Sequence, residues 1–407
     1  MSSIPAVSNT IPARLVVVMA VCCALAVSAI YYHQPLLPLM AASFGLTPTQ
    51  AGLIATLTQL GYGIGLLLIV PLADCRQPRS LALWAIGANT VALLACAAAP
   101  SFALLCASSF LVGVTAVTAQ LIIPALSGLA ATAERGRVVG TLLSGLSAGL
   151  LLARTVGGVV GEHAGWRAVF LMASLVDGLL LVIVAKNLPA MPRVASIRYG
   201  ELMRSLGSLL REERVLRFSA ASGFLIFAAF SSLWATLAAL LTQPPYRFGS
   251  TTIGLFGLVT VLGIVASPRI GAWADRLGAR TVALAGAIVL AVGFACIAAG
   301  GRSLGWLIIG MVLLDLGNRT GLVANQARIH TLRPEARSRL NTVFMGSYFL
   351  GGAVGAALGN YGVHRAGWLG LAAVGALLAL AATTISALSP RDSRVTLMDA
   401  SAIRKQG

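Results

Sequence analysis

The chain has 407 residues, of which 58% are hydrophobic and only 10% are charged, and its formal net charge is +17. Soluble domains carry about 25% charged residues, so this composition excludes a soluble protein that covers its surface with charge. The positive charge does not indicate a nucleic-acid partner, because the Lys and Arg residues fall mainly in alternate connections between apolar runs. No basic helix with interleaved aromatic side chains is visible.

Apolar runs recur along the whole chain, and each has the length of about 20 residues that a helix needs to cross a bilayer. We therefore predict an all-α membrane protein, surrounded by lipid. The twelve predicted spans lie near 14–37, 50–72, 80–99, 102–125, 138–160, 166–186, 217–241, 251–270, 280–300, 304–327, 339–361 and 367–388.

The N-terminus has some features of a secretory signal. Arg14 precedes an apolar run, and the small residues Val27-Ser28-Ala29 resemble a cleavage site. Because many further spans follow, and because the first ten residues contain no Lys or Arg, we predict an uncleaved first span.

The distribution of positive charge predicts the orientation. If both termini lie on one side of the membrane, that side receives twenty-three of the 29 Lys and Arg residues. The other side receives only Arg167, Arg247, Arg302 and Arg365. Positive loops are retained on the cytoplasmic side. The termini and the long connection between the sixth and seventh spans are therefore predicted to be cytoplasmic, in a bacterial inner membrane.

An internal repeat relates the two halves of the chain. Asp74, after the second span, corresponds to Asp275, after the eighth, at an offset of 201 residues. Arg135-Gly-Arg137 corresponds to Arg337-Ser-Arg339 at an offset of 202. We therefore predict two six-helix halves related by a parallel repeat. The predicted units are an N-terminal half at 1–187, a cytoplasmic linker at 188–216, a C-terminal half at 217–389 and a cytoplasmic tail at 390–407.

Two stretches resemble motifs of the major facilitator superfamily. Gly271-x-x-Ala-Asp275-Arg276-x-Gly278-x-Arg280 resembles a loop motif of that family, and the first-half copy, Pro71 to Arg79, keeps the acidic and basic residues but lacks the glycines. Ser144-Gly145-x-x-x-Gly149, followed by Arg154-Thr-Val-Gly157-Gly158, resembles the glycine-rich fifth-helix motif of family antiporters without its usual Gly-Pro pair. Ser109 stands where the family has a fourth-helix arginine.

The resemblance implies a substrate cavity between the halves, opened to alternate sides by rocking of one half against the other. Small residues at Gly145, Gly149, Gly351, Gly355 and Gly359 would let helices approach closely, either for this motion or for static packing. The resemblance also implies a conformational latch, with a solvated turn as the alternative. The latch residues would be Asp74, Arg76, Arg79, Arg135, Arg137, Gly271, Asp275, Arg276, Gly278, Arg280, Arg337 and Arg339.

No catalytic arrangement, nucleotide-binding loop or metal spacing is visible, and the six cysteines are interpreted as structural. We therefore expect neither an enzyme nor a cofactor, and expect an ion gradient to supply the energy. Ionisable residues inside spans are functional candidates because they are costly to retain there. Asp315, one turn before Arg319, is a candidate for reversible protonation, with a permanent ion pair as the alternative. Asp177 is the second proton candidate, with packing, for instance on Arg154, as the alternative.

Polar and aromatic residues in several spans are candidates for lining the cavity. Arg154 could attract an anionic group of the substrate or pair with a carboxylate. The sequence Tyr31-Tyr32-His33-Gln34 could form the outer part of a substrate site or an aromatic belt at the membrane interface. The other cavity candidates are Gln120, Asn318, Arg319, Asn325 and Gln326.

These features predict a monomeric secondary transporter that exports a small organic or drug-like compound in exchange for protons. The direction of export rests on the resemblance to the antiporter branch. A proton symporter or facilitator, for uptake or for sugar efflux, is the alternative. A receptor that does not transport is a third possibility, against which the polar stripe of the tenth span argues.

Overall fold

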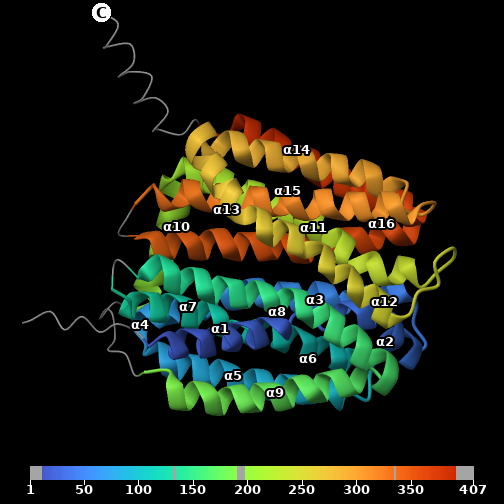
Figure 1. Cartoon of the computed structure of the whole chain (residues 1–407), viewed down its shortest axis with the longest axis horizontal. Helices are drawn as coiled ribbons and strands as arrows, with labels where there is room; N and C mark the ends of the chain where they lie inside the picture. Colours follow the sequence, from blue (N-terminus) through green and yellow to red (C-terminus); the bar gives the residue numbers. More distant parts are fainter. Residues whose placement is uncertain (1–11, 132–133, 190–197, 334–335, 391–407) are drawn as a thin grey trace, which may run out of the picture.

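The structure is a computed structural model that describes residues 12–131, 134–189, 198–333 and 336–390. These residues form helices joined by short connections, and no strand occurs among them. The helices of the N-terminal half and of the C-terminal half gather in two adjacent groups (Figure 1). The part of the predicted linker at 190–197, with Arg193, and the tail at 391–407, with its four basic residues, lie outside the described residues.

The elements of the first half follow the predicted spans in order. They are α1 (Ala13–Ser28), η1 (Gln34–Leu36), α2 (Leu37–Ser43), α3 (Pro48–Leu68), α4 (Leu72–Cys75), α5 (Pro78–Ala97), α6 (Phe102–Thr115), α7 (Thr118–Leu129), α8 (Arg135–Ala164) and α9 (Trp166–Asn187). The remaining elements are α10 (Tyr199–Glu212), α11 (Arg214–Leu241), α12 (Ser250–Leu255), η2 (Phe256–Val259), α13 (Thr260–Leu277), α14 (Ala279–Ala298), α15 (Leu304–His330) and α16 (Arg337–Leu388).

The prediction of twelve spans is confirmed. Ten of the described helices are long and apolar enough to cross a membrane, and α1 is a shorter apolar helix. The 52-residue α16 contains two spans, because the chain bends at Ala366 and Gly367. Gly367 has a φ of 54°, a backbone conformation that residues with a side chain rarely adopt.

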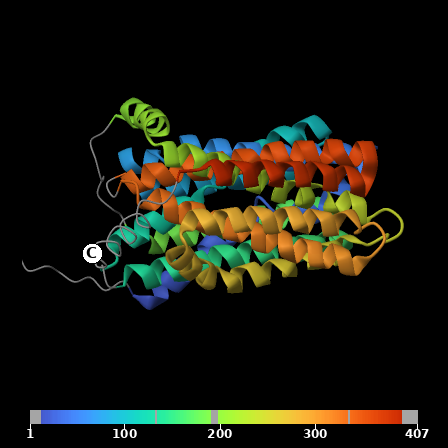
Figure 2. The ribbon, with the colours of Figure 1, turned by 90° about the horizontal axis from the view of Figure 1, so that it is seen from above.

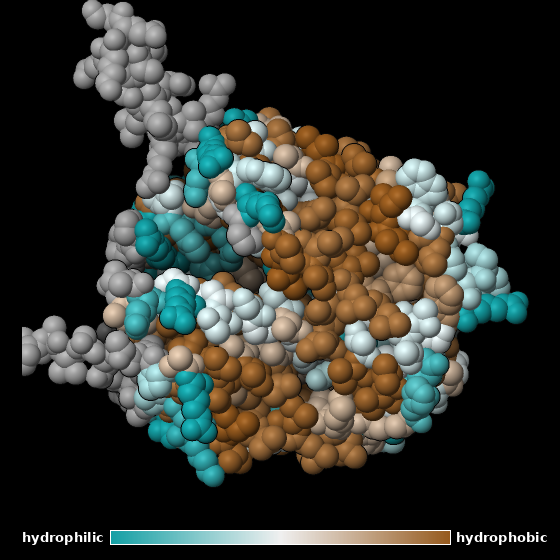
Figure 3. Space-filling model, in the orientation of Figure 1, coloured by the Kyte–Doolittle hydropathy of each residue, from teal (hydrophilic) through white to brown (hydrophobic). Residues whose placement is uncertain are grey.

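The surface has the pattern expected of a protein embedded in lipid. Figure 3 shows a broad apolar band over the middle of the molecule, with hydrophilic residues at the two ends of the helices. Large apolar side chains such as Leu175 and Leu377 are more than two-thirds exposed. An apolar surface of this extent would be a liability in water, so the chain is a multi-pass membrane protein.

The linker contains a helix that the sequence reasoning did not predict. Three leucines, Leu202, Leu206 and Leu209, form the buried face of α10. The hydroxyl of Tyr199 donates a hydrogen bond to the carbonyl oxygen of Leu68. The linker helix is therefore anchored at the end of the bundle where α1 begins and α16 ends (Figures 1 and 2).

Glycines bring equivalent helix pairs into close contact in the two halves. Gly149 of α8 lies against the backbone of Ala24 in α1, and Gly355 of α16 lies against the backbone of Ala228 in α11. Both contacts lie within one half, so these glycines hold each half together. This arrangement favours static packing, which was the alternative to a role of these glycines in the motion.

This packing predicts the effect of adding one methyl group at Gly355. Its Cβ would overlap the backbone of Ala228, so Gly355→Ala should destabilise the protein by about 1–3 kcal/mol, as overpacking does. The measurement is the Tm of the purified protein in detergent.

Gly178 provides the matched control, because a Cβ there would meet no atom within 4 Å. Gly178→Ala should leave the Tm unchanged or raise it, since alanine is the better helix former. Equal Tm values for the two variants would contradict the packing account.

Candidate functional site

A central cavity lies between the two halves. Its volume is about 110 Å³, and its walls come from α1, α3, α7 and α8 on one side and from α11, α13, α15 and α16 on the other. Six residues singled out from the sequence line it: Tyr31, Gln120, Arg154, Asp315, Asn318 and Arg319. A site shared by both halves in this way changes shape whenever the halves move relative to one another.

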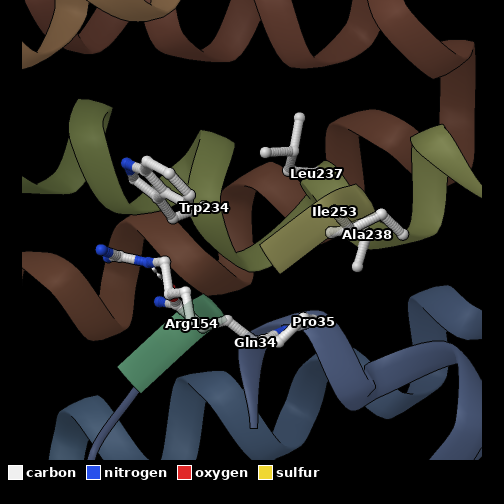
Figure 4. A pocket seen from close by; sticks show the side chains of 7 residues that line it. All are labelled: Gln34, Pro35, Arg154, Trp234, Leu237, Ala238 and Ile253. Carbon is white, nitrogen blue, oxygen red and sulfur yellow. Dashed lines mark hydrogen bonds between the residues drawn. The ribbon is translucent and has the colours of Figure 1, made fainter. Parts of the chain in front are cut away.

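Arg154 is the cation of the first-half wall, and it is 2% exposed. Its Nε donates a 2.6 Å hydrogen bond to Oε1 of Gln34, and one terminal nitrogen donates to the carbonyl oxygen of Leu150 at 3.2 Å. Its guanidinium carbon lies 3.9 Å from the ring centroid of Trp234 and 4.9 Å from that of Tyr31. Figure 4 shows Arg154 between Gln34 and Trp234. Such contacts with aromatic faces stabilise a desolvated cation.

Asp315 and Arg319 are the charged residues of the second-half wall. Asp315 is 4% exposed, and its Oδ2, which faces Gly263 of α13, has no hydrogen-bond partner among the described residues. The Nε of Arg319 is also buried without a partner in that part of the chain. The ion pairs of the described residues join Arg333 to Glu212 and Glu213. Asp315 and Arg319 are therefore not ion-paired in this conformation, so an ion pair between them is not permanent.

Aromatic side chains complete the wall, and the sequence reasoning missed them. Phe227 stacks on Tyr348 with ring centroids 4.1 Å apart, and Phe349 meets Tyr62 edge-on at 4.5 Å. The hydroxyl of Tyr348 donates to Oδ1 of Asn318 at 2.7 Å. The sequence contained one indication of an aromatic wall, because the helical spacing of Phe227, Phe230 and Trp234 places three rings on one face of α11.

The stretch Tyr31 to Gln34 is buried, at 2–6% exposure, so its interpretation as an exposed aromatic belt is wrong. Tyr31 lines the central cavity, and Gln34 lines a small adjoining hollow with Arg154 and Trp234. Tyr32 and His33 are buried but line neither space.

The polar residues near the linker end of α15 serve packing. Asn325 donates hydrogen bonds to Ser222 and to the carbonyl oxygen of Gly321. Gln326 donates to Oδ1 of Asn341 at 3.3 Å. Neither residue lines the central cavity.

Asp177 of α9 is buried but does not line the central cavity. The hydrogen bonds described for Arg154 go to Gln34 and Leu150, and no ion pair joins Arg154 to Asp177 in the described part of the chain. Their suggested pairing is therefore absent. Among the described residues no group of His, Cys, Asp and Glu could hold a metal ion.

Four of the eight basic residues of the expected latch bind backbone carbonyls at helix ends. Arg79 donates to the carbonyl of Ala185, and its repeat equivalent, Arg280, donates to those of Ser386 and Ala387. Arg135 and Arg337 form a second equivalent pair, which donate at 3.0 Å to the carbonyls of Ser127 and His330 respectively. Carbonyls at a helix C-terminus lack partners within the helix, so these arginines fix loops within their own half.

The two acidic residues of the loops differ in their surroundings. Asp74 is half-buried, and the charge of Arg339, in the other half, acts on its carboxylate. Asp275 is exposed and makes no ion pair with any described residue.

The remaining latch residues make no specific contact with another described residue that would hold a latch. Arg76, Arg137 and Arg276 are exposed, and Gly271 has open space beside it. Gly278 turns the chain between α13 and α14 with a φ of 86°.

The halves are joined at the end of the bundle opposite the linker. The backbone N–H of Thr251, at the start of α12, donates a 2.6 Å hydrogen bond to Oε2 of Glu162 in α8. Nearby, the hydroxyl of Thr155 donates to the carbonyl of Gly254 at 3.3 Å. Figure 3 shows that the surface between the halves is hollowed at the linker end. This conformation is therefore closed by α8 and α12 at one end.

The Glu162 contact can be tested by removing its charge. Glu162→Gln replaces a carboxylate acceptor by a weaker neutral one, so the closed end should open more often. A cysteine at Ile253, which is buried beside this contact, should then react several-fold faster with a membrane-impermeant maleimide.

Glu201→Gln in α10 is the matched control, because it removes one negative charge at the other end of the molecule. It should leave the labelling rate of the Ile253→Cys reporter unchanged. Equal rates in the Glu162 and Glu201 variants would show that the contact does not hold this end closed.

A bundle of twelve spans, with a polar and aromatic cavity enclosed by two repeated halves, defines a membrane transporter rather than an enzyme. The model of the Major Facilitator Superfamily matches residues 19–270 and again residues 219–404. The chain belongs to this superfamily.

The relatives are named as transporters. The chain is 37% identical over 366 residues to the uncharacterized transporter YgaY of Escherichia coli O157:H7, covering 90% of this chain and 93% of the relative. It is 32% identical to a transporter of Streptomyces coelicolor, covering 91% of this chain and 86% of that protein. A protein of Helicobacter acinonychis named "Probable sugar efflux transporter" is 24% identical, over 84% of this chain and 86% of its own length.

Two solved structures have the same fold. The human organic anion transporter MFSD10 (TETRAN) superposes with a TM-score of 0.70 at 19% identity, covering 93% of this chain and all of that one. The nucleoside transporter NupG superposes with a TM-score of 0.75 at 12% identity, covering 91% of this chain and 98% of that one. At these identities the likeness extends to the fold alone.

Proposed function

We propose that this protein is a proton-coupled secondary transporter that exports a small organic compound through the central cavity by alternating access. The observation that carries the proposal is Asp315, a buried carboxylate in a cavity shared by both halves, with one oxygen unpartnered among the described residues. A group of this kind can take up and release a proton as the cavity faces one side and then the other. Asp177 lies away from the cavity, so it is the weaker proton candidate.

The direction of transport rests on two supports. The fifth span resembles the glycine-rich motif of family antiporters, and one relative is named as an efflux transporter. We place the protein as a monomer in a bacterial inner membrane, with both termini and the linker in the cytoplasm, because the linker end carries the excess of Lys and Arg. In that orientation the hollowed end faces the cytoplasm, and the α8–α12 contact closes the outer end.

Proton symport is the second candidate, and one observation favours it. Arg154 and Arg319 line the cavity together with Asp315, so an anionic substrate and the Asp315 carboxylate would be attracted to the same cations. Protonation of Asp315 would then promote binding of the anion, and the two would move together. Uptake or facilitated sugar movement belongs to this same alternative.

Flux measurements separate these candidates. The full-length protein is reconstituted in liposomes, a pH gradient is imposed, and a compound panel is screened for fluxes that change the luminal pH. Substrate and protons moving in opposite directions support antiport, whereas movement in the same direction supports symport. No proton movement with any transported compound would contradict proton coupling.

Asp315→Asn tests the assignment of the proton site. The amide retains the shape of the side chain but does not titrate, so proton-coupled flux should be abolished. Exchange of labelled for unlabelled substrate, which needs no net proton movement, should remain measurable. Asp177→Asn is the matched control and should retain coupling; unchanged coupling in the Asp315 variant would remove this residue from the mechanism.

A further inference from the structure

The central cavity has an imbalance of charge. Its ionisable side chains other than tyrosines are Arg154 and Arg319, which are cations, and Asp315. With Asp315 ionised the three side chains carry one net positive charge, and with Asp315 protonated they carry two. A charge enclosed in a protein interior is costly unless it is paired, so the cavity favours an occupant that supplies negative charge.

The hydrogen-bonding capacity of these cations is only partly used. Arg154 donates to one neutral side chain and to one carbonyl of its own helix. The Nε of Arg319 is buried without an acceptor in the described part of the chain. Guanidinium groups carry five N–H donors in a planar fork that suits carboxylate and phosphate oxygens. An anionic group that lies between the two arginines would therefore supply the missing acceptors.

The rest of the lining is aromatic and apolar. Phe227, Phe230 and Tyr348 meet ring to ring, and Ile264 and Leu322 lie on the same cavity. These surfaces supply little hydrogen bonding to a compound covered with hydroxyl groups, but they match the faces of a planar ring. The small volume of the cavity, about 110 Å³, leaves room for a single ring at most in this conformation, since a cavity of about 150 Å³ binds benzene.

We propose that the cavity binds a small aromatic organic anion, with its anionic group between Arg154 and Arg319 and its ring against Phe227 and Tyr348. This inference rests on one part of the proposed function, that this cavity is the substrate site. An anionic substrate favours the symport candidate over antiport, because protonation of Asp315 would strengthen the attraction of the cavity for an anion. It adds that the substrate is negatively charged and that the rest of the substrate is aromatic. A cation of the same shape is disfavoured because it would meet two guanidinium groups and a single carboxylate.

Compounds matched in shape but different in charge test the proposal. Benzoate and 2-naphthoate are each compared with the corresponding amide and with the corresponding arylmethylammonium ion, by calorimetric titration of the full-length protein in nanodiscs. At least one carboxylate should bind about tenfold or more tightly than its amide, the size expected for hydrogen bonds to a charged partner. The ammonium ions should bind more weakly than the amides.

Variants connect this preference to the two arginines. Arg154→Gln and Arg319→Gln should each lower the affinity for the carboxylate about tenfold or more while changing the affinity for the amide little. Arg319→Lys, which keeps the charge, should restore part of the loss. Arg302→Gln is the matched control, because Arg302 is exposed in the loop between α14 and α15, and its variant should bind as the unmodified protein does.

The outcomes separate failure of this inference from failure of the proposed function. Equal affinities for the three charge types, preferential binding of the ammonium ions, or no binding of either carboxylate would overturn the inference. If such compounds were nevertheless transported in liposomes, with a flux that Phe227→Ala or Asp315→Asn reduced, the cavity would remain the substrate site. Transport that no cavity variant altered would overturn both.

Discussion

A guanidinium inside a membrane-spanning bundle finds little water, so the protein must supply its surroundings, and Arg154 shows how much of the fold this requires. Gln34, its acceptor, lies in the 3₁₀ turn that interrupts the first span. Trp234, whose ring it faces, comes from α11 in the other half. Gly254 of α12 packs so closely on α8 that a Cβ atom at this position would approach the backbone of Arg154. The side chain and backbone of this one residue thus connect α8 with η1, α11 and α12, and so connect both halves.

The repeat gives the halves the same scaffold but not the same chemistry. Each half packs a glycine-bearing helix on its first helix and ties two of its loops with equivalent arginines. Among the described residues, the carboxylate that lines the central cavity comes from the second half, at Asp315, and the loop acid influenced by a charge of the opposite half is Asp74. Equivalent scaffolds suit a rocking motion, whereas the unequal side chains give the cavity its net charge.

Hydropathy predicted the twelve spans because a helix in lipid must be apolar over its whole length, and the fixed offsets between loop residues predicted the two halves. The same constraint found part of the site. Arg154, Asp315 and Arg319 stand out because charge within an apolar span is costly. Phe227 and Tyr348 do not stand out, because an aromatic residue in an apolar helix suits lipid, core and cavity equally well.

The loop arginines show a second limit of the sequence. A motif that contains both Asp and Arg suggested ion pairs, but the nearest unsatisfied groups in the fold are carbonyls at helix ends, as at Ala185 and Ala387. The helix α10 was missed for a different reason. Its three buried leucines follow helical spacing, but the charged residues around them suggested a solvated linker.

The central claim is that the two ends of the bundle open in alternation around the charged cavity. Distances between spin labels on opposite halves test it directly, in nanodiscs with and without a transported compound. One pair, at Val159 and Leu255, spans α8 and α12 near the closed end, and the other, at Gly140 and Leu277, spans α8 and α13 at the linker end; all four positions are exposed. We predict that the first distance lengthens when the second shortens. Distances that stay fixed, or that change in the same sense, would contradict the account.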